Sequence, residues 1–168
     1  MRSLLVCSVG PYALRRRPLL VGIPLERVAA ARPLESLLPF PGAVPPLLGL
    51  TLHEGQIIPV FSAQALLRLP EPAAASCTAE TQGEDAAEPD QVSGIEPARH
   101  LVLVKGGAGV VGLVVSKAVG IDRPLHWAGP NVLAPLASPV IAGAVLRPDC
   151  WIAVLDPARL PAVRPAAA

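Results

Sequence analysis

The chain has 168 residues, a length typical of one domain, and 52% of them are hydrophobic, which is enough for a substantial core. Its 21 prolines are spread along the whole sequence, and because proline interrupts helices, a bundle of long helices is excluded. The formal net charge is +1 and the one basic run is Arg15–Arg17, so we expect no nucleic-acid binding.

In the first half of the chain, short apolar runs bounded by glycine or proline predict β-strands. They cover Leu4–Val9, Leu19–Ile23, Leu47–Leu52 and Gln56–Phe61. The first run is too short for the apolar core of an export signal, so we interpret it as a strand and expect a cytoplasmic protein. A short helical turn is expected at Ser62–Leu69.

The segment Pro70–Ala98 differs in composition from everything around it. It carries seven acidic residues, no Lys or Arg and almost no large apolar side chain. Such a segment buries too little surface to offset its ordering entropy, so we predict a disordered loop within a single domain spanning 1–168. The loop would separate structured halves at 3–69 and 99–160, with a tail from Pro161 to Ala168.

In the second half, four further runs predict strands, and a helical turn is expected at Pro157–Leu160. The runs cover His100–Val104, Val110–Ser116, Val140–Leu146 and Trp151–Leu155. Several are apolar at nearly every position, as in strands buried on both faces or in a small barrel. We therefore predict an all-β fold of two small barrels. The most apolar stretch, Leu101–Gly120, contains two lysines and five glycines, so we expect no membrane span.

The run Gly107–Gly112 matches the G-x-G-x-x-G pattern of dinucleotide-binding loops. In those loops a helix follows the glycines, and an acidic residue follows about twenty residues later. Here the next residues are Leu113-Val114-Val115, which favour a strand, and no acid stands at that distance. We interpret the run as a glycine-rich hairpin turn and expect no cofactor.

Catalytic and metal-binding patterns are also missing from the sequence. The histidines, His53, His100 and His126, have no second ligand at metal-site spacing. The cysteines are Cys7, Cys77 and Cys150, an odd number without a C-x-x-C pair, which fits a reducing compartment. The most conspicuous polar cluster, His53-Glu54-Gly55, is interpreted as a turn, so we expect no enzyme activity.

Two landmarks resemble the CheW family. In the family signature, a glycine is followed by a short strand, an Asn-Leu-Arg-Gly turn and an Ile/Val-Val-Pro-Val strand. This signature is similar to the run Gly49-Leu50-Thr51-Leu52-His53-Glu54-Gly55-Gln56-Ile57-Ile58-Pro59-Val60. The run Leu101–Val104 with Val111–Ser116 is similar to the family's paired strands. The run Val140–Val145 with Trp151–Asp156 is similar to its closing hairpin.

This resemblance implies two five-stranded β-barrels without an active site. It also implies an adaptor that couples the cytoplasmic tip of a chemoreceptor to the regulatory domain of a CheA-type histidine kinase, at membrane-associated receptor arrays. We expect the kinase-side contact around Val28, Ala31, Leu47 and Leu50, although each of these could equally be core. We expect the receptor-side contact at His53 and Glu54.

The chain departs from the family pattern at four positions. Glu54 stands in place of the turn arginine, Leu52 in place of asparagine, and Ser62 and Ser116 in place of aspartates. The charge reversal at Glu54 predicts poor binding to a standard receptor tip. Two other readings stay open: a nucleotide-binding enzyme using Gly107–Gly112, and a self-associating structural β protein.

Overall fold

The computed structural model describes residues 3–10, 19–68, 99–124, 126–129 and 138–161. The predicted disordered loop, the tail beyond Pro161, the basic run Arg15–Arg17 and Cys77 lie outside these residues. Within them the chain is almost entirely β, with one short α-helix, α1 (Ala63–Leu66), and two 3-10 turns, η1 (Leu25–Arg27) and η3 (Pro157–Arg159).

The strands follow the predicted runs closely. They are β1 (Leu4–Val9), β2 (Leu19–Pro24), β3 (Val28–Pro33), β4 (Leu47–His53), β5 (Gln56–Ser62), β6 (His100–Gly106), β7 (Gly109–Val115), β8 (Lys117–Asp122), β9 (Ile141–Leu146) and β10 (Trp151–Leu155). Eight were predicted, with ends shifted by two residues at most. The two not predicted are β3 and β8, which are edge strands with alternating or mostly exposed residues and therefore lack an apolar run.

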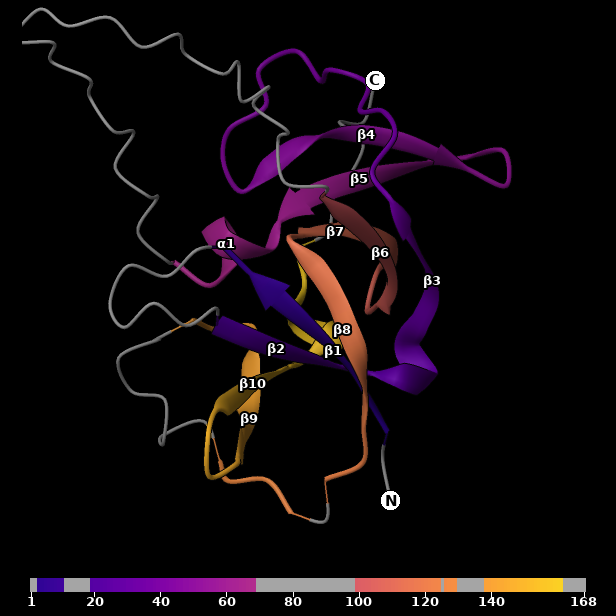
Figure 1. Cartoon of the computed structure of the whole chain (residues 1–168). Coiled ribbons are helices and arrows are strands. Elements are labelled where there is room, and N and C mark those ends of the chain that lie inside the picture. The colour runs from indigo at the N-terminus through magenta and orange to yellow at the C-terminus, as the bar shows by residue number, and fades with distance from the viewer. Residues whose placement is uncertain (1–2, 11–18, 69–98, 125, 130–137, 162–168) are drawn as a thin grey trace, which may run out of the picture.

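The strands form two five-stranded sheets, which confirms the predicted architecture. Sheet A has the order β8-β1-β2-β10-β9 and sheet B the order β3-β6-β7-β5-β4. Figure 1 shows sheet B in the upper part of the view and sheet A in the lower part. The sheets do not coincide with the two halves of the chain. Each takes a hairpin from one half and three strands from the other.

The two sheets have the same topology, so the chain consists of two equivalent units, β1 to α1 and β6 to η3. In each sheet an antiparallel hairpin pairs in parallel with the last strand of the other unit. In sheet A, Val154 lies between its partners Gly143 and Gly22 on the two neighbouring strands. In sheet B, Val60 lies in the same way between Gly49 and Gly112. Each unit is therefore incomplete alone and completes its barrel with strands of the other.

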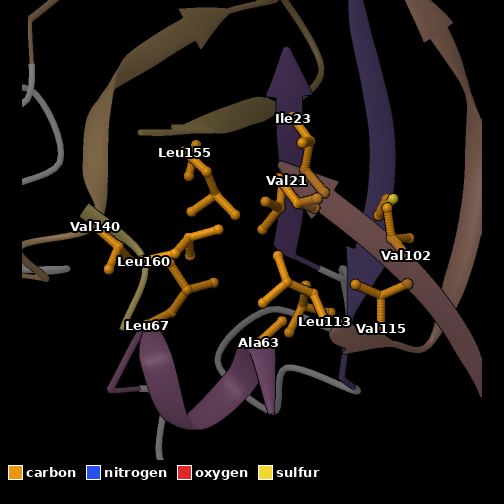
Figure 2. Packing of buried hydrophobic residues seen from close by; sticks show 14 of the residues in the cluster. Val21, Ile23, Ala63, Leu67, Val102, Leu113, Val115, Val140, Leu155 and Leu160 are labelled. Atoms are coloured by element: carbon orange, nitrogen blue, oxygen red, sulfur yellow. The ribbon is translucent and has the colours of Figure 1, made fainter. Parts of the chain in front are cut away.

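Three apolar clusters explain why so many strand positions are apolar on both faces. The largest lies between the sheets and is built from both, including Val21, Ile23, Val102, Leu113 and Leu155 (Figure 2). A second cluster is built from β1, β9 and β10 of sheet A, and a third from β5, β6 and β7 of sheet B. The inner strands alternate between the shared cluster and their own sheet's cluster, so the prediction of burial on both faces is confirmed.

The two edges of each sheet are joined by contacts outside its regular strand pairing. In sheet B the Leu38 and Leu50 backbones exchange two hydrogen bonds of 2.7 and 2.9 Å, which join the segment after β3 to the opposite edge strand β4. In sheet A the Ala128 and Ala144 backbones exchange bonds of 2.8 and 2.9 Å and join the segment after β8 to β9. These isolated bridges link the two edges of each sheet, which gives each sheet a barrel-like form without closing it completely.

Candidate functional site

The hairpin β4–β5 presents the polar cluster predicted at His53-Glu54-Gly55. His53 lies opposite Gln56, so Glu54 and Gly55 are the two turn residues. Their φ angles are 50° and 77°, the left-handed values that a type I′ turn requires and that glycine adopts freely. The Glu54 side chain is 85% exposed, and its Oε1 lies 4.0 Å from His53 Nε2. Glu54 therefore projects into solvent, as predicted, and is available to a partner.

Next to this turn, the outer face of the same hairpin is apolar. Leu52 lies opposite Ile57, and the two residues are 57% and 67% exposed. On the inner face, Thr51 and Ile58 are buried. Large exposed apolar side chains beside an ordered hairpin are typical of protein-binding surfaces. The pair was not predicted from the sequence, although its position directly beside a two-residue turn was a usable signal.

The four residues predicted to contact the kinase do not form one patch. Val28 and Leu47 are half-buried and pack against the core between the sheets. Ala31 is exposed on β3, whereas Leu50 is half-buried on β4 beside Leu38. Ala31 and Leu50 therefore lie on the first and last strands of sheet B, and the contact of Arg32 with Leu52 joins these two edges.

Because the two units are equivalent, the hairpin β9–β10 has a surface similar to that of β4–β5. Leu146 and Trp151 lie opposite each other on β9 and β10, at the positions equivalent to Leu52 and Ile57. Both are 52% exposed. The molecule therefore carries two exposed apolar pairs at equivalent places, one on each sheet.

The serines that replace family aspartates have structural roles. Ser62 Oγ accepts a hydrogen bond of 3.2 Å from the Ala65 amide and caps α1. At the equivalent position Asp156 caps η3 through a 3.0 Å bond from the Ala158 amide. Ser116 Oγ accepts a 2.8 Å bond from the Gly10 amide. Serine and aspartate are both good N-caps, so the change at Ser62 preserves the local structure.

The glycine run Gly107–Gly112 forms a hairpin, which confirms the prediction. Gly106 lies opposite Gly109, so Gly107 and Ala108 make the turn, and β7 follows where a dinucleotide site needs a helix. The turn packs on η3, because a Cβ at Gly107 would lie 3.0 Å from the Ala158 carbonyl oxygen. A pocket of about 230 Å³ beside it is lined largely by backbone and apolar side chains.

The ionisable groups of the described residues do not assemble into a reactive centre. No group of three His, Cys, Asp or Glu side chains among them is placed to hold a metal ion. Burial raises the pKa of the Cys7 thiol to about 11, which makes it a poor nucleophile at neutral pH. The hydrogen bond from Arg147 lowers the pKa of Asp122. In the described part of the chain, no helix has the length and apolarity to cross a membrane.

The chain is similar to a family model and to solved structures. A family model described as CheW-like domain matches residues 14–163. The crystal structure of scaffolding protein TtCheW from Thermoanaerobacter tengcongensis is similar, with a TM-score of 0.66 over 94% of this chain and 85% of that chain. The two sequences are 15% identical, so this second match shows the fold alone. No curated protein sequence matches the chain.

Proposed function

The chain belongs to the CheW-like domain family, and we propose that it is a non-catalytic adaptor that couples a chemoreceptor-like protein to a CheA-type histidine kinase. Membership supports a scaffold or adaptor role in chemotaxis-type signalling. The observation that carries the proposal is the exposed apolar pair Leu52 and Ile57 beside a charged turn, on a rigid sheet. An adaptor needs ordered surfaces of this kind and no reactive groups.

The kinase-side contact is assigned to the outer surface of sheet B. Of the four residues expected there, Ala31 and Leu50 are accessible, and Leu52 and Ile57 extend the apolar area next to Leu50. Val28 and Leu47 support this surface from the core. The regulatory domain of the kinase would cover the apolar side chains, as in protein interfaces whose central residues are apolar and desolvated.

The assignment is tested with Leu52→Glu in the full-length chain, measured against the kinase regulatory domain. Loss of an exposed apolar anchor is expected to weaken binding by about 2 kcal/mol, roughly thirtyfold, with little change in unfolding temperature. The matched control is Leu146→Glu, an equally exposed leucine at the equivalent position of sheet A. If the wild-type chain does not bind the kinase domain at all, the proposed function is wrong. If Leu52→Glu binds normally, the assigned surface is wrong.

The receptor-side contact is assigned to His53 and Glu54 at the tip of the same hairpin. A receptor surface that accommodates arginine at this position offers a carboxylate, and Glu54 would repel it. We therefore expect this chain to select a receptor with a basic residue opposite Glu54. We also expect it to act in the cytoplasm, at receptor arrays. Such a repulsive element excludes the wrong partner as effectively as new contacts favour the right one.

Glu54→Arg tests this selectivity. The change is expected to weaken binding to the cognate receptor by about tenfold, or ~1.4 kcal/mol, and to strengthen binding to a standard receptor tip. Both effects should shrink at higher salt, because the charges are exposed and screened. If Glu54→Arg binds both receptors with the same affinity as the wild-type chain, at low and at moderate salt, residue 54 lies outside the interface.

A further inference from the structure

The internal repetition allows the charged residues of one sheet to be compared with their counterparts in the other. Asp122 on β8 lies opposite Leu4, and Arg32 on β3 lies opposite Leu101. The two leucines are equivalent, because each places its Cδ1 within about 3 Å of the Cβ position of the matching glycine, Gly22 or Gly112. Asp122 and Arg32 therefore hold the same position on the edge strands of the two sheets.

In sheet A this position is electrically neutralised. Arg147, which follows the opposite edge strand β9, donates from Nη2 to both carboxylate oxygens of Asp122, at 2.6 and 2.9 Å. Charge-assisted hydrogen bonds of this kind are stronger than bonds between neutral groups. The pair links the two edges of sheet A with a matched acid and base.

In sheet B the same position carries an arginine whose contacts are neutral. Arg32 Nη2 reaches the Leu52 carbonyl oxygen at 3.2 Å and Thr51 Oγ1 at 3.5 Å. Among the described residues, no carboxylate forms an ion pair with Arg32. The guanidinium therefore links the edges of sheet B, as Arg147 does in sheet A, but without an anion.

Arg32 lies in a pocket of about 300 Å³ between β3 and β4. Four leucines, Leu34, Leu38, Leu52 and Leu101, line it together with Glu35, Ser36 and Thr51. Where the leucine side chains replace water beside the guanidinium, its attraction for an anion is stronger. A side chain with an apolar stem and a carboxylate end has the shape and chemistry to fill this space.

We propose that this pocket binds a carboxylate side chain of the receptor, which supplies to Arg32 the anion that Asp122 supplies to Arg147. The proposal rests on the proposed function, because the pocket residue Leu52 adjoins the turn His53-Glu54, which is assigned to the receptor. It also extends that function. The receptor needs an acidic residue at Arg32 and a basic residue at Glu54, and this pair of opposite charges fixes its orientation on the hairpin.

Substitutions at Glu35 and at Arg32 should change the affinity for the receptor in opposite directions. Glu35 lines the same pocket as Arg32, so its negative charge opposes an incoming anion. Removing its charge with Glu35→Gln should therefore tighten binding of the receptor, whereas Arg32→Gln should weaken it. A purely structural role of Arg32 in closing sheet B predicts no gain from Glu35→Gln.

The first experiment needs no partner and uses the full-length chain with butyrate as the probe. Butyrate is expected to give saturable NMR shifts of the backbone amide signals of Leu52 and Leu101, which line the pocket, and butyramide, which has the same stem without the charge, should not. These shifts should be abolished by Arg32→Gln and retained in weakened form by Arg32→Lys. Equal shifts with butyrate and butyramide, or none, overturn the proposal. A butyrate shift that appears only after the seven acids between Pro70 and Ala98 are neutralised would mean that the chain fills its own pocket, and also overturns it.

The second experiment measures binding to the cytoplasmic fragment of a receptor that the wild-type chain binds. We expect about tenfold weaker binding for Arg32→Gln and about threefold tighter binding for Glu35→Gln, with unfolding temperatures recorded for both. Unchanged receptor affinity in both variants overturns the proposal even if butyrate binds. If no receptor fragment binds the wild-type chain, the proposed function fails, and the butyrate experiment still decides whether the pocket takes a carboxylate.

Discussion

The substitution Gly49→Ala tests whether the Leu38–Leu50 bridge closes sheet B. A Cβ added at Gly49 would lie 2.6 Å from the Leu38 carbonyl oxygen, although real Cβ contacts essentially never fall below 3.0 Å. The atom in the way is backbone, so it cannot move aside by changing a rotamer. The same oxygen accepts the 2.9 Å bond from the Leu50 amide, and the Leu38 amide donates the 2.7 Å bond in return. The new methyl group must therefore push the two segments apart at their bridge.

Loss of both bridge hydrogen bonds sets the expected magnitude. At about 1 kcal/mol for each bond, the free energy of unfolding should fall by roughly 2 kcal/mol. In a chain of this size, that loss lowers the unfolding midpoint by about 4–8 °C. Thermal unfolding followed by circular dichroism, with urea titration as a second probe, measures both quantities.

Two further glycines provide the controls. Gly120 on β8 has no heavy atom within 4 Å of its Cβ position, so Gly120→Ala should change stability by no more than about 0.5 kcal/mol. Gly143 is the equivalent of Gly49 in sheet A, and its Cβ would collide with the Ala128 carbonyl oxygen. Gly143→Ala should therefore destabilise the chain as Gly49→Ala does. If Gly49→Ala is as stable as Gly120→Ala, the bridge does not hold the sheet closed and the reasoning is refuted.

Three other predictions concern stability and ligands. Replacing residues 70–98 with a short Gly/Ser linker should leave the unfolding midpoint nearly unchanged, because Ser62 and Leu101 lie two strands apart, about 10 Å, across β7; a large drop would contradict this. Titration calorimetry with NAD, FAD and ATP should show no saturable heat, because the Gly107-Ala108 turn leads into a strand, and micromolar binding abolished by Gly109→Val would show the opposite. Asp122→Asn should destabilise the chain slightly at neutral pH. The wild-type advantage should fade as the pH falls through the lowered pKa of Asp122, because a depressed carboxyl pKa stabilises the fold only while the group is ionised; a difference that persists in acid would separate Asp122 from the ion pair.

The sequence by itself determined the strand content and the turns. Runs such as Leu101–Val104 are rich in β-branched residues and end at glycine or proline, and this local pattern located eight of the ten strands. The strand after Gly107–Gly112 and the tight turn at Glu54-Gly55 were also predictable, because both depend on residues next to each other in the chain.

Only the tertiary structure decided how the units combine and which apolar residues face a partner. The exchange of strands between the halves depends on pairings such as Val154 with Gly22, which are far apart in sequence and leave no local signal. The edge strands β3 and β8 were missed because an edge exposes residues that a central strand buries. Val28 and Leu52 look alike in the sequence, yet one packs against the core and the other is exposed. The same apolar chemistry serves a core and a protein interface, so burial, which depends on the whole fold, is what separates them.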